Sequence, residues 1–139
     1  MKEKIIGFTA GTFDMFHIGH LNLLRNAKSR CDYLIVGVNS DQLVEEYKHK
    51  KAVVPLEERM EIVRALRCVD EVMRIDTLDK VVSWKKKHYD LLFIGDDWKG
   101  DERWKRTEEE MLQYGVKVVY LPYTEGTNST LLREKLVDL

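Results

Sequence analysis

The sequence predicts an α/β fold with a doubly wound, parallel sheet of five strands, in a single domain that spans residues 1–139. Five short apolar runs, several of them rich in β-branched residues, are typical of strands covered on both faces. Stretches with apolar residues at helical spacing separate these runs, which favours parallel strands joined by right-handed crossovers. A chain of 139 residues, 44% of them hydrophobic, is long enough to bury one core.

The expected strands are Ile5–Ala10, Tyr33–Val38, Val69–Ile75, Leu91–Gly95 and Val116–Leu121. Helical spacing occurs between and after them, at Leu21, Leu24 and Ala27, at Leu56, Met60, Val63 and Leu66, less cleanly from Leu78 to Lys85, and from Leu131 to Leu136. Pro55 with Glu57 and Glu58 is a favourable helix start, because proline fits the first turn and carboxylates complement the helix dipole.

Charge and cysteine content argue against several classes of protein. The chain has 23 basic and 24 acidic residues, a balance that argues against a general nucleic-acid binder. Its apolar runs are too short to span a membrane, and its first residues lack the apolar segment of a signal peptide. Cys31 and Cys68 form no C-x-x-C motif, so we expect two buried thiols in a cytoplasmic protein rather than a disulfide or zinc site.

The most informative segment, Gly11 to His20, follows the first expected strand, where ligands of open α/β sheets bind. It contains neither a G-x-G-x-x-G nor a P-loop motif. Gly11 nevertheless allows close approach of the backbone, and the helix start supplies free N–H groups for a phosphate. His17 and His20 share a helix face, and Gly19 leaves room beside them. The pair suits phosphoryl transfer, although packed histidines or a metal-binding pair would give the same spacing.

Two later segments have charged residues where loops are expected. Lys48, Lys50 and Lys51 form a basic run, which is consistent either with phosphate contact or with a solvated surface. Asp96 and Asp97 follow the fourth expected strand, where they could face a ligand or cap a turn. Trp98, next to them, could stack on a base or cover the end of the sheet.

Gly11-Thr12-Phe13-Asp14 followed by His17-Ile18-Gly19-His20 resembles the signature of the HIGH-motif nucleotidyltransferase superfamily, which is Rossmann-like. The chain is most similar to the small bacterial glycerol-3-phosphate cytidylyltransferases, and the resemblance covers nearly the whole chain. Other segments that resemble this family are the lysine-rich segment 48–52, Arg59, the R-Y-V-D-E-V-like segment 67–72, the G-D-D-W-x-G block 95–100 and the segment 124–130, which resembles R-T-E-G-I-S-T-T.

The resemblance implies that an acceptor phosphate attacks the α-phosphorus of CTP and that pyrophosphate leaves. Mg²⁺ would accompany the triphosphate. The implied catalytic residues are His17, His20, Lys48 and Lys50. The implied nucleotide-binding residues are Gly11, Thr12, Phe13, Asp14, Gly19, Gly95, Asp96, Asp97, Thr124, Gly126, Ser129, Thr130 and Arg133. The implied acceptor-binding residues are Asp14, Lys48, Arg59, Leu78 and Tyr123. The family also implies a homodimer through residues 67–72 and products that serve as cell-envelope precursors.

The chain departs from the family pattern near the expected acceptor. Tyr123 stands where the family has an arginine, and Leu78 stands where it has a tryptophan. Arg133 could replace the missing cation, or it could lie solvated on a helix surface. A glycerol 3-phosphate acceptor is therefore favoured, with another phosphorylated polyol, sugar or amino-alcohol, or use of ATP, as alternatives. A non-catalytic nucleotide-binding module and a structural metal-binding protein are the rival interpretations.

Overall fold

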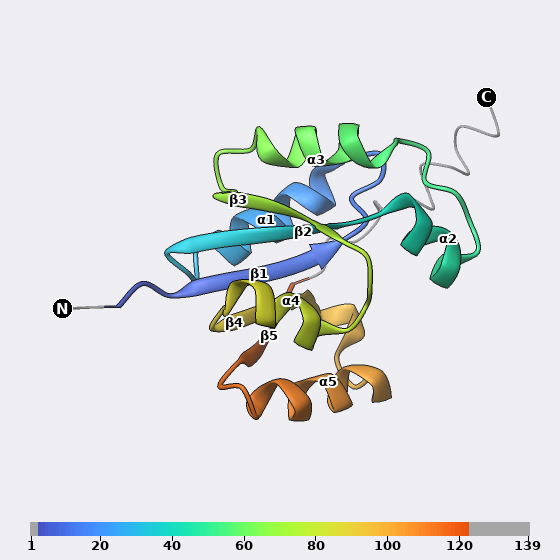
Figure 1. Cartoon of the computed structure of the whole chain (residues 1–139). Coiled ribbons are helices and arrows are strands. Elements are labelled where there is room, and N and C mark those ends of the chain that lie inside the picture. The colour runs from blue at the N-terminus through green and yellow to red at the C-terminus, as the bar shows by residue number, and fades with distance from the viewer. Residues whose placement is uncertain (1–2, 123–139) are drawn as a thin grey trace.

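The computed structural model describes residues 3–122. Within them, one parallel sheet has the strand order β3-β2-β1-β4-β5 (Figure 1). The strands are β1 (Ile6–Gly11), β2 (Tyr33–Asn39), β3 (Glu71–Ile75), β4 (Leu91–Gly95) and β5 (Lys117–Leu121). The predicted α/β class, the five parallel strands and the double winding are confirmed, with strand ends that match the predicted ones or differ by at most two residues.

Helices cover both faces of the sheet. Helices α1 (Ile18–Lys28) and α3 (Leu56–Arg64) lie on one face, and α4 (Lys80–Lys87) and α5 (Glu102–Leu112) lie on the other (Figure 1). A short helix, α2 (Asp41–Lys48), follows β2, and a 3₁₀ turn, η1 (Asp96–Trp98), follows β4. The apolar spacing did not predict α2 and α5. The lysine-rich segment is also not wholly a loop, because Lys48 is the last residue of α2.

The two faces of the sheet belong to separate buried clusters. Leu24 and Ala27 of α1 pack with Val63 of α3 against one face. Trp104 and Met111 of α5 pack against the other. Cys31 and Cys68 are free thiols and are half-buried rather than buried as expected. None of the helices within residues 3–122 is long and apolar enough to cross a membrane.

The central strand β1 pairs differently with its two neighbours. It pairs with β2 from Ile6 to Gly11, whereas its pairing with β4 is confined to Gly7 and Phe8. Beyond that point the Thr9 hydroxyl donates a hydrogen bond to the Phe93 carbonyl, at 3.0 Å. The chain winds from β1 toward β3 on one side, and β4 and β5 lie on the other. The carboxyl end of β1 is therefore the switch point, the position where open α/β sheets bind ligands.

Candidate active site

The loop between β1 and α1 has a strained backbone. Phe13 and Met15 adopt left-handed conformations, with φ of 54° and 49°, which side chains other than glycine rarely adopt. Between them, the buried Asp14 carboxylate accepts hydrogen bonds from the backbone N–H groups of Val53 and Val54, both at 2.8 Å. Strained residues of this kind persist where the surrounding contacts hold them, and here the loop leads directly into the histidine pair.

His17 and His20 cap the N-terminus of α1. The Nδ1 atom of His17 accepts a hydrogen bond from the Gly19 N–H at 3.1 Å, and the Nδ1 atom of His20 accepts one from the His17 N–H at 3.2 Å. Because each Nδ1 is an acceptor, the neutral form of each ring has its proton on Nε2. Within the described residues, the His17 Nε2 atom is buried without a hydrogen-bond partner.

Burial favours the neutral form of both imidazoles. Burial lowers the pKa of His17. Burial, followed by the charges of His17 and Lys48, lowers the pKa of His20 to about 3. The rings stack with their centroids 3.9 Å apart, and the rings of Phe13 and Phe16 lie 5.4 and 5.2 Å from that of His20. The predicted pair is thus two N–H donors at the positive end of a helix dipole, an arrangement that suits an anionic phosphoryl group.

A polar cluster lies at the ends of β1 and β2, and sequence analysis named its Thr12 but missed its Asn39 and Tyr47. The Thr12 and Tyr47 hydroxyls are 3.0 Å apart, and the Asn39 amide nitrogen donates to the Tyr47 hydroxyl at 3.1 Å. Asn39 is buried, and within the described chain its Oδ1 atom has no hydrogen-bond partner. The signal for Asn39 was its place as the polar end of an otherwise apolar strand, beside the carboxyl end of β1.

One lysine of the basic run acts electrostatically on the histidine pair. Lys48, Lys50 and Lys51 are exposed, and Lys48 ends α2. The Lys48 charge contributes to the lowered pKa of His20, which brings one expected phosphate-binding lysine into the field of the histidine pair. The Lys48 ammonium also lies 5.6 Å from the ring centroid of Tyr47.

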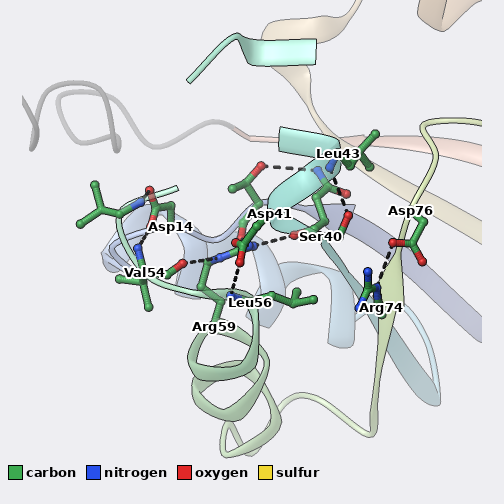
Figure 2. A network of polar contacts seen from close by, with 12 residues as sticks. Asp14, Ser40, Asp41, Leu43, Val54, Leu56, Arg59, Arg74 and Asp76 are labelled. Carbon is green, nitrogen blue, oxygen red and sulfur yellow. Dashed lines mark hydrogen bonds and ion pairs between the residues drawn. The ribbon is translucent and has the colours of Figure 1, made fainter. Parts of the chain in front are cut away.

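Arg59 lies inside the protein, and its guanidinium hydrogen-bonds to protein oxygens (Figure 2). Its burial and these four bonds, which use four of its five N–H groups, leave it little access to an acceptor. Leu78, another of the expected acceptor residues, lies half-buried before α4 and packs on the cluster that contains Trp104. The structure therefore does not show Arg59 and Leu78 lining one pocket open to an acceptor.

The end of β4 presents the acidic pair. Asp96 and Asp97 lie on the surface in η1, and the partial burial of the Asp97 carboxyl raises its pKa. A Cβ atom at Gly95 would lie 2.6 Å from the Asp97 Oδ1 atom, so the Asp97 carboxylate folds back over this glycine. Trp98 is 41% exposed, and the Arg103 guanidinium carbon lies 5.5 Å from its ring centroid.

Several expected site residues lie outside the described residues. These are Tyr123, Thr124, Gly126, Ser129, Thr130 and Arg133. Over residues 3–122, no group of three or more His, Cys, Asp or Glu side chains could hold a metal ion.

Comparison with known proteins connects this geometry to one family. The family model described as cytidylyltransferase-like matches residues 8–135. A glycerol-3-phosphate cytidylyltransferase of Bacillus spizizenii is 37% identical over 138 residues, which cover 99% of each chain. An FAD synthase of Thermococcus onnurineus is 36% identical over 126 residues, covering 88% of this chain and 82% of the relative.

A solved structure agrees with the fold. The lipopolysaccharide core biosynthesis protein from Thermoplasma volcanium superposes with a TM-score of 0.77 over 88% of this chain and all of that chain, at 24% identity. The motifs at the end of β1 thus occur on a sheet whose architecture is shared with a known protein.

Proposed function

Because this chain belongs to the cytidylyltransferase-like family and is a nucleotidyltransferase, we propose that it transfers CMP from CTP to a small phosphorylated alcohol, with glycerol 3-phosphate as the favoured acceptor. The observation that carries the proposal is the pair of neutral imidazoles at the start of α1, each fixed through Nδ1 by the backbone. The relatives named for glycerol 3-phosphate support this choice of acceptor, since the similarity extends over 99% of the chain.

In the proposed reaction, an oxygen of the acceptor phosphate attacks the α-phosphorus of CTP. A new P–O bond forms there, the bond between the α-phosphorus and its β-bridging oxygen breaks, and pyrophosphate leaves with that bond's electron pair. The Nε2–H groups of His17 and His20 donate to the α-phosphate oxygens as charge builds on them. Lys48 and Lys50 neutralise the leaving phosphates.

Mg²⁺ is part of this proposal as an ion brought by the triphosphate. Mg²⁺ keeps most of its water and binds through one or two carboxylates and substrate phosphates, so it does not need a cage of protein ligands. The Asp14 carboxylate accepts hydrogen bonds on both oxygens from the backbone of the segment after α2. We therefore assign Asp14 to holding that segment, and the ion to the triphosphate, where it would offset phosphate charge.

The acceptor subsite is proposed at the ends of β1 and β2 and before α4. Thr12, Asn39 and Tyr47 supply hydroxyl and amide groups there, and Leu78 lies before α4. An amide with one buried atom lacking a partner favours a ligand with hydroxyl groups. This chemistry suits glycerol 3-phosphate and also a larger phosphorylated polyol.

Pyrophosphate release in the presence of each nucleoside triphosphate and a panel of phosphorylated alcohols tests the proposal. The panel contains glycerol 3-phosphate, larger polyol phosphates, sugar phosphates, phosphorylated amino-alcohols and FMN. We expect turnover with CTP and glycerol 3-phosphate, and none in the His17→Ala/His20→Ala double variant. Turnover confined to ATP and FMN would overturn the proposal in favour of FAD synthesis, the activity for which one relative is named. Nucleotide binding without turnover on any acceptor would contradict it as well.

We further propose a cytoplasmic homodimer that contacts its partner copy through residues 67–72. Two features support this contact. Strand β3 lies at one edge of the sheet, and Arg67 at the start of the segment is exposed. Val69 and Val72 are half-buried against the core of their own protomer. Cell-envelope polymers are the proposed destination of the product.

A further inference from the structure

Arg59 is the largest fully buried side chain in the described part of the chain, and its guanidinium joins four segments (Figure 2). Its Nη1 atom donates to the carbonyls of Thr12 and Asn39, both at 2.7 Å. Its Nε atom donates to the carbonyl of Val54 at 2.8 Å, and its Nη2 atom pairs with the Asp41 carboxylate at 2.5 Å. These acceptors follow β1, end β2, begin α2 and lie in the connection between α2 and α3.

Two carboxylates hold the same connection from other directions. Asp14 accepts hydrogen bonds from the N–H groups of Val53 and Val54, and Asp41 accepts one from the Leu56 N–H at 3.2 Å. The backbone from Val53 to Leu56 is thus bonded to the histidine loop on one side and to the start of α2 on the other. The lysine run ends at Lys51, two residues before this bonded stretch.

A buried guanidinium is costly unless its donors are satisfied, and here each of its three nitrogens donates to at least one protein oxygen, with four of the five N–H groups bonded. Arginine suits the place because its planar fork reaches acceptors in several directions, whereas a lysine ammonium is a single point charge. The bonds to Thr12 and Val54 connect the segment that holds His17 with the segment that follows Lys48 and Lys50.

We propose that Arg59 is a positioning residue for nucleotidyl transfer: it sets the placement of the lysine run relative to the histidine pair and does not contact the acceptor. The inference rests on the proposed function and deepens it. It predicts that replacing the Arg59 guanidinium displaces the lysine run. Lys48 then contributes less to kcat even though its own side chain is intact. A direct contact with the acceptor would instead leave the contribution of Lys48 unchanged.

A double-mutant cycle between Arg59→Lys and Lys48→Ala tests the proposal. We expect Arg59→Lys to lower kcat at least about tenfold, because a 1 Å misplacement can cost about a hundredfold. The KM for the acceptor should change less than about threefold, and Lys48→Ala should cost several-fold less in the Arg59→Lys background than in the wild type. The matched control is Arg64→Lys, which alters an exposed arginine of the same helix that pairs with Glu61.

Two results would overturn the proposal. The first is a double variant whose loss in kcat equals the product of the losses of Arg59→Lys and Lys48→Ala. The second is an Arg59→Lys enzyme with a raised KM for the acceptor and an unchanged kcat. If Arg59→Lys does not fold, the same cycle is run with Asp41→Asn, which removes the exposed partner of the pair and leaves the buried guanidinium in place. The cycle is also measured on CTP binding by calorimetry without acceptor. Absence of any transfer activity in the wild type would end the proposed function, while the binding cycle would still decide the role of Arg59.

Discussion

At the scale of single residues, the histidine pair combines capping of a helix with chemistry. The backbone bonds to the two Nδ1 atoms fix the ring orientation, and the Nε2 atoms are left to donate. We expect His17→Ala and His20→Ala each to lower kcat by about 10²–10³-fold, because donors aimed at developing charge contribute at this level. Steady-state rates of pyrophosphate release measure the loss, and circular dichroism checks that α1 is retained. Wild-type turnover in either variant would remove that histidine from the reaction.

The buried His20 also makes stability depend on pH. Its pKa is lowered to about 3 in the folded protein from an ordinary value of 6.5. Between these values the unfolded chain binds a proton that the folded chain does not, so stability falls as the pH drops from about 7 toward 3. The melting temperature of the wild type minus that of His20→Gln should therefore be larger at pH 7.5 than at pH 4.5. The exposed His49 provides the matched control, His49→Gln, and a difference that is equal at both pH values would contradict the prediction.

The residue types of the histidine loop were predictable, but the surroundings of Arg59 were not. Gly11 to His20 form a contiguous motif after an apolar strand, so a local pattern placed both histidines at a helix start. Arg59 follows two glutamates on a polar helix, a context typical of a solvated residue. Its burial depends on carbonyls at Thr12 and Asn39, which lie 47 and 20 residues away, and local spacing contains no sign of them.

At the scale of elements, α5 begins with a side-chain cap. The Asp101 carboxylate accepts hydrogen bonds from the N–H groups of Arg103 and Trp104, at 2.9 and 3.3 Å. Asp101→Ala should lower the free energy of unfolding by about 1 kcal/mol, since it removes the acceptor for otherwise unpaired N–H groups at the helix start. Denaturant unfolding measures the loss. Glu102→Ala, one residue later and without such a bond among those described, is the control and should change stability much less.

The close contact between β2 and β3 makes a second element-level prediction. A Cβ atom at Gly37 would lie 2.5 Å from the Ile75 Cγ1 atom and 3.0 Å from the Phe8 ring. Gly37→Ala should therefore destabilise the protein by about 1–3 kcal/mol through overpacking. Gly100→Ala cannot serve as the control, because Gly100 has a φ of 91° and an alanine there would strain the backbone for a different reason. A melting temperature for Gly37→Ala equal to that of the wild type would show that the side chains of Ile75 and Phe8 yield without cost.

The strands were more predictable than the helices for a physical reason. Strands covered on both faces need nearly continuous apolar sequence, and four of the five runs have at most one polar residue, whereas Val69–Ile75 has three charged ones. Helix α5 contacts the sheet through few buried residues, chiefly Trp104 and Met111, while its other positions are polar. Helix α2 buries Leu43 and Val44, adjacent residues that give no helical period. Neither helix therefore has the repeated apolar spacing from which helices are predicted.

At the scale of the whole molecule, the proposed dimer is open to a direct test. Light scattering at micromolar concentration should return about 33 kDa, twice the chain mass of 16.4 kDa. Arg67→Glu places a charge of opposite sign at an exposed position of the proposed two-fold contact and should shift the mass toward that of one chain. Lys99→Glu, an exposed charge reversal after η1, is the control. A wild-type mass near 16 kDa would end the proposal.

The order of the sheet also affects how the chain is made. Strand β1 is synthesised first but lies in the middle, and it obtains its second neighbour only when residues 91–95 have emerged from the ribosome. A nascent chain that has formed only β1, β2 and β3 would leave the edge of β1 that faces β4 unpaired, with backbone N–H and C=O groups that other chains can pair with. Nascent chains that stall before Leu91 are thus the species on which chaperones would act, and slow synthesis through α4 would lengthen their exposure.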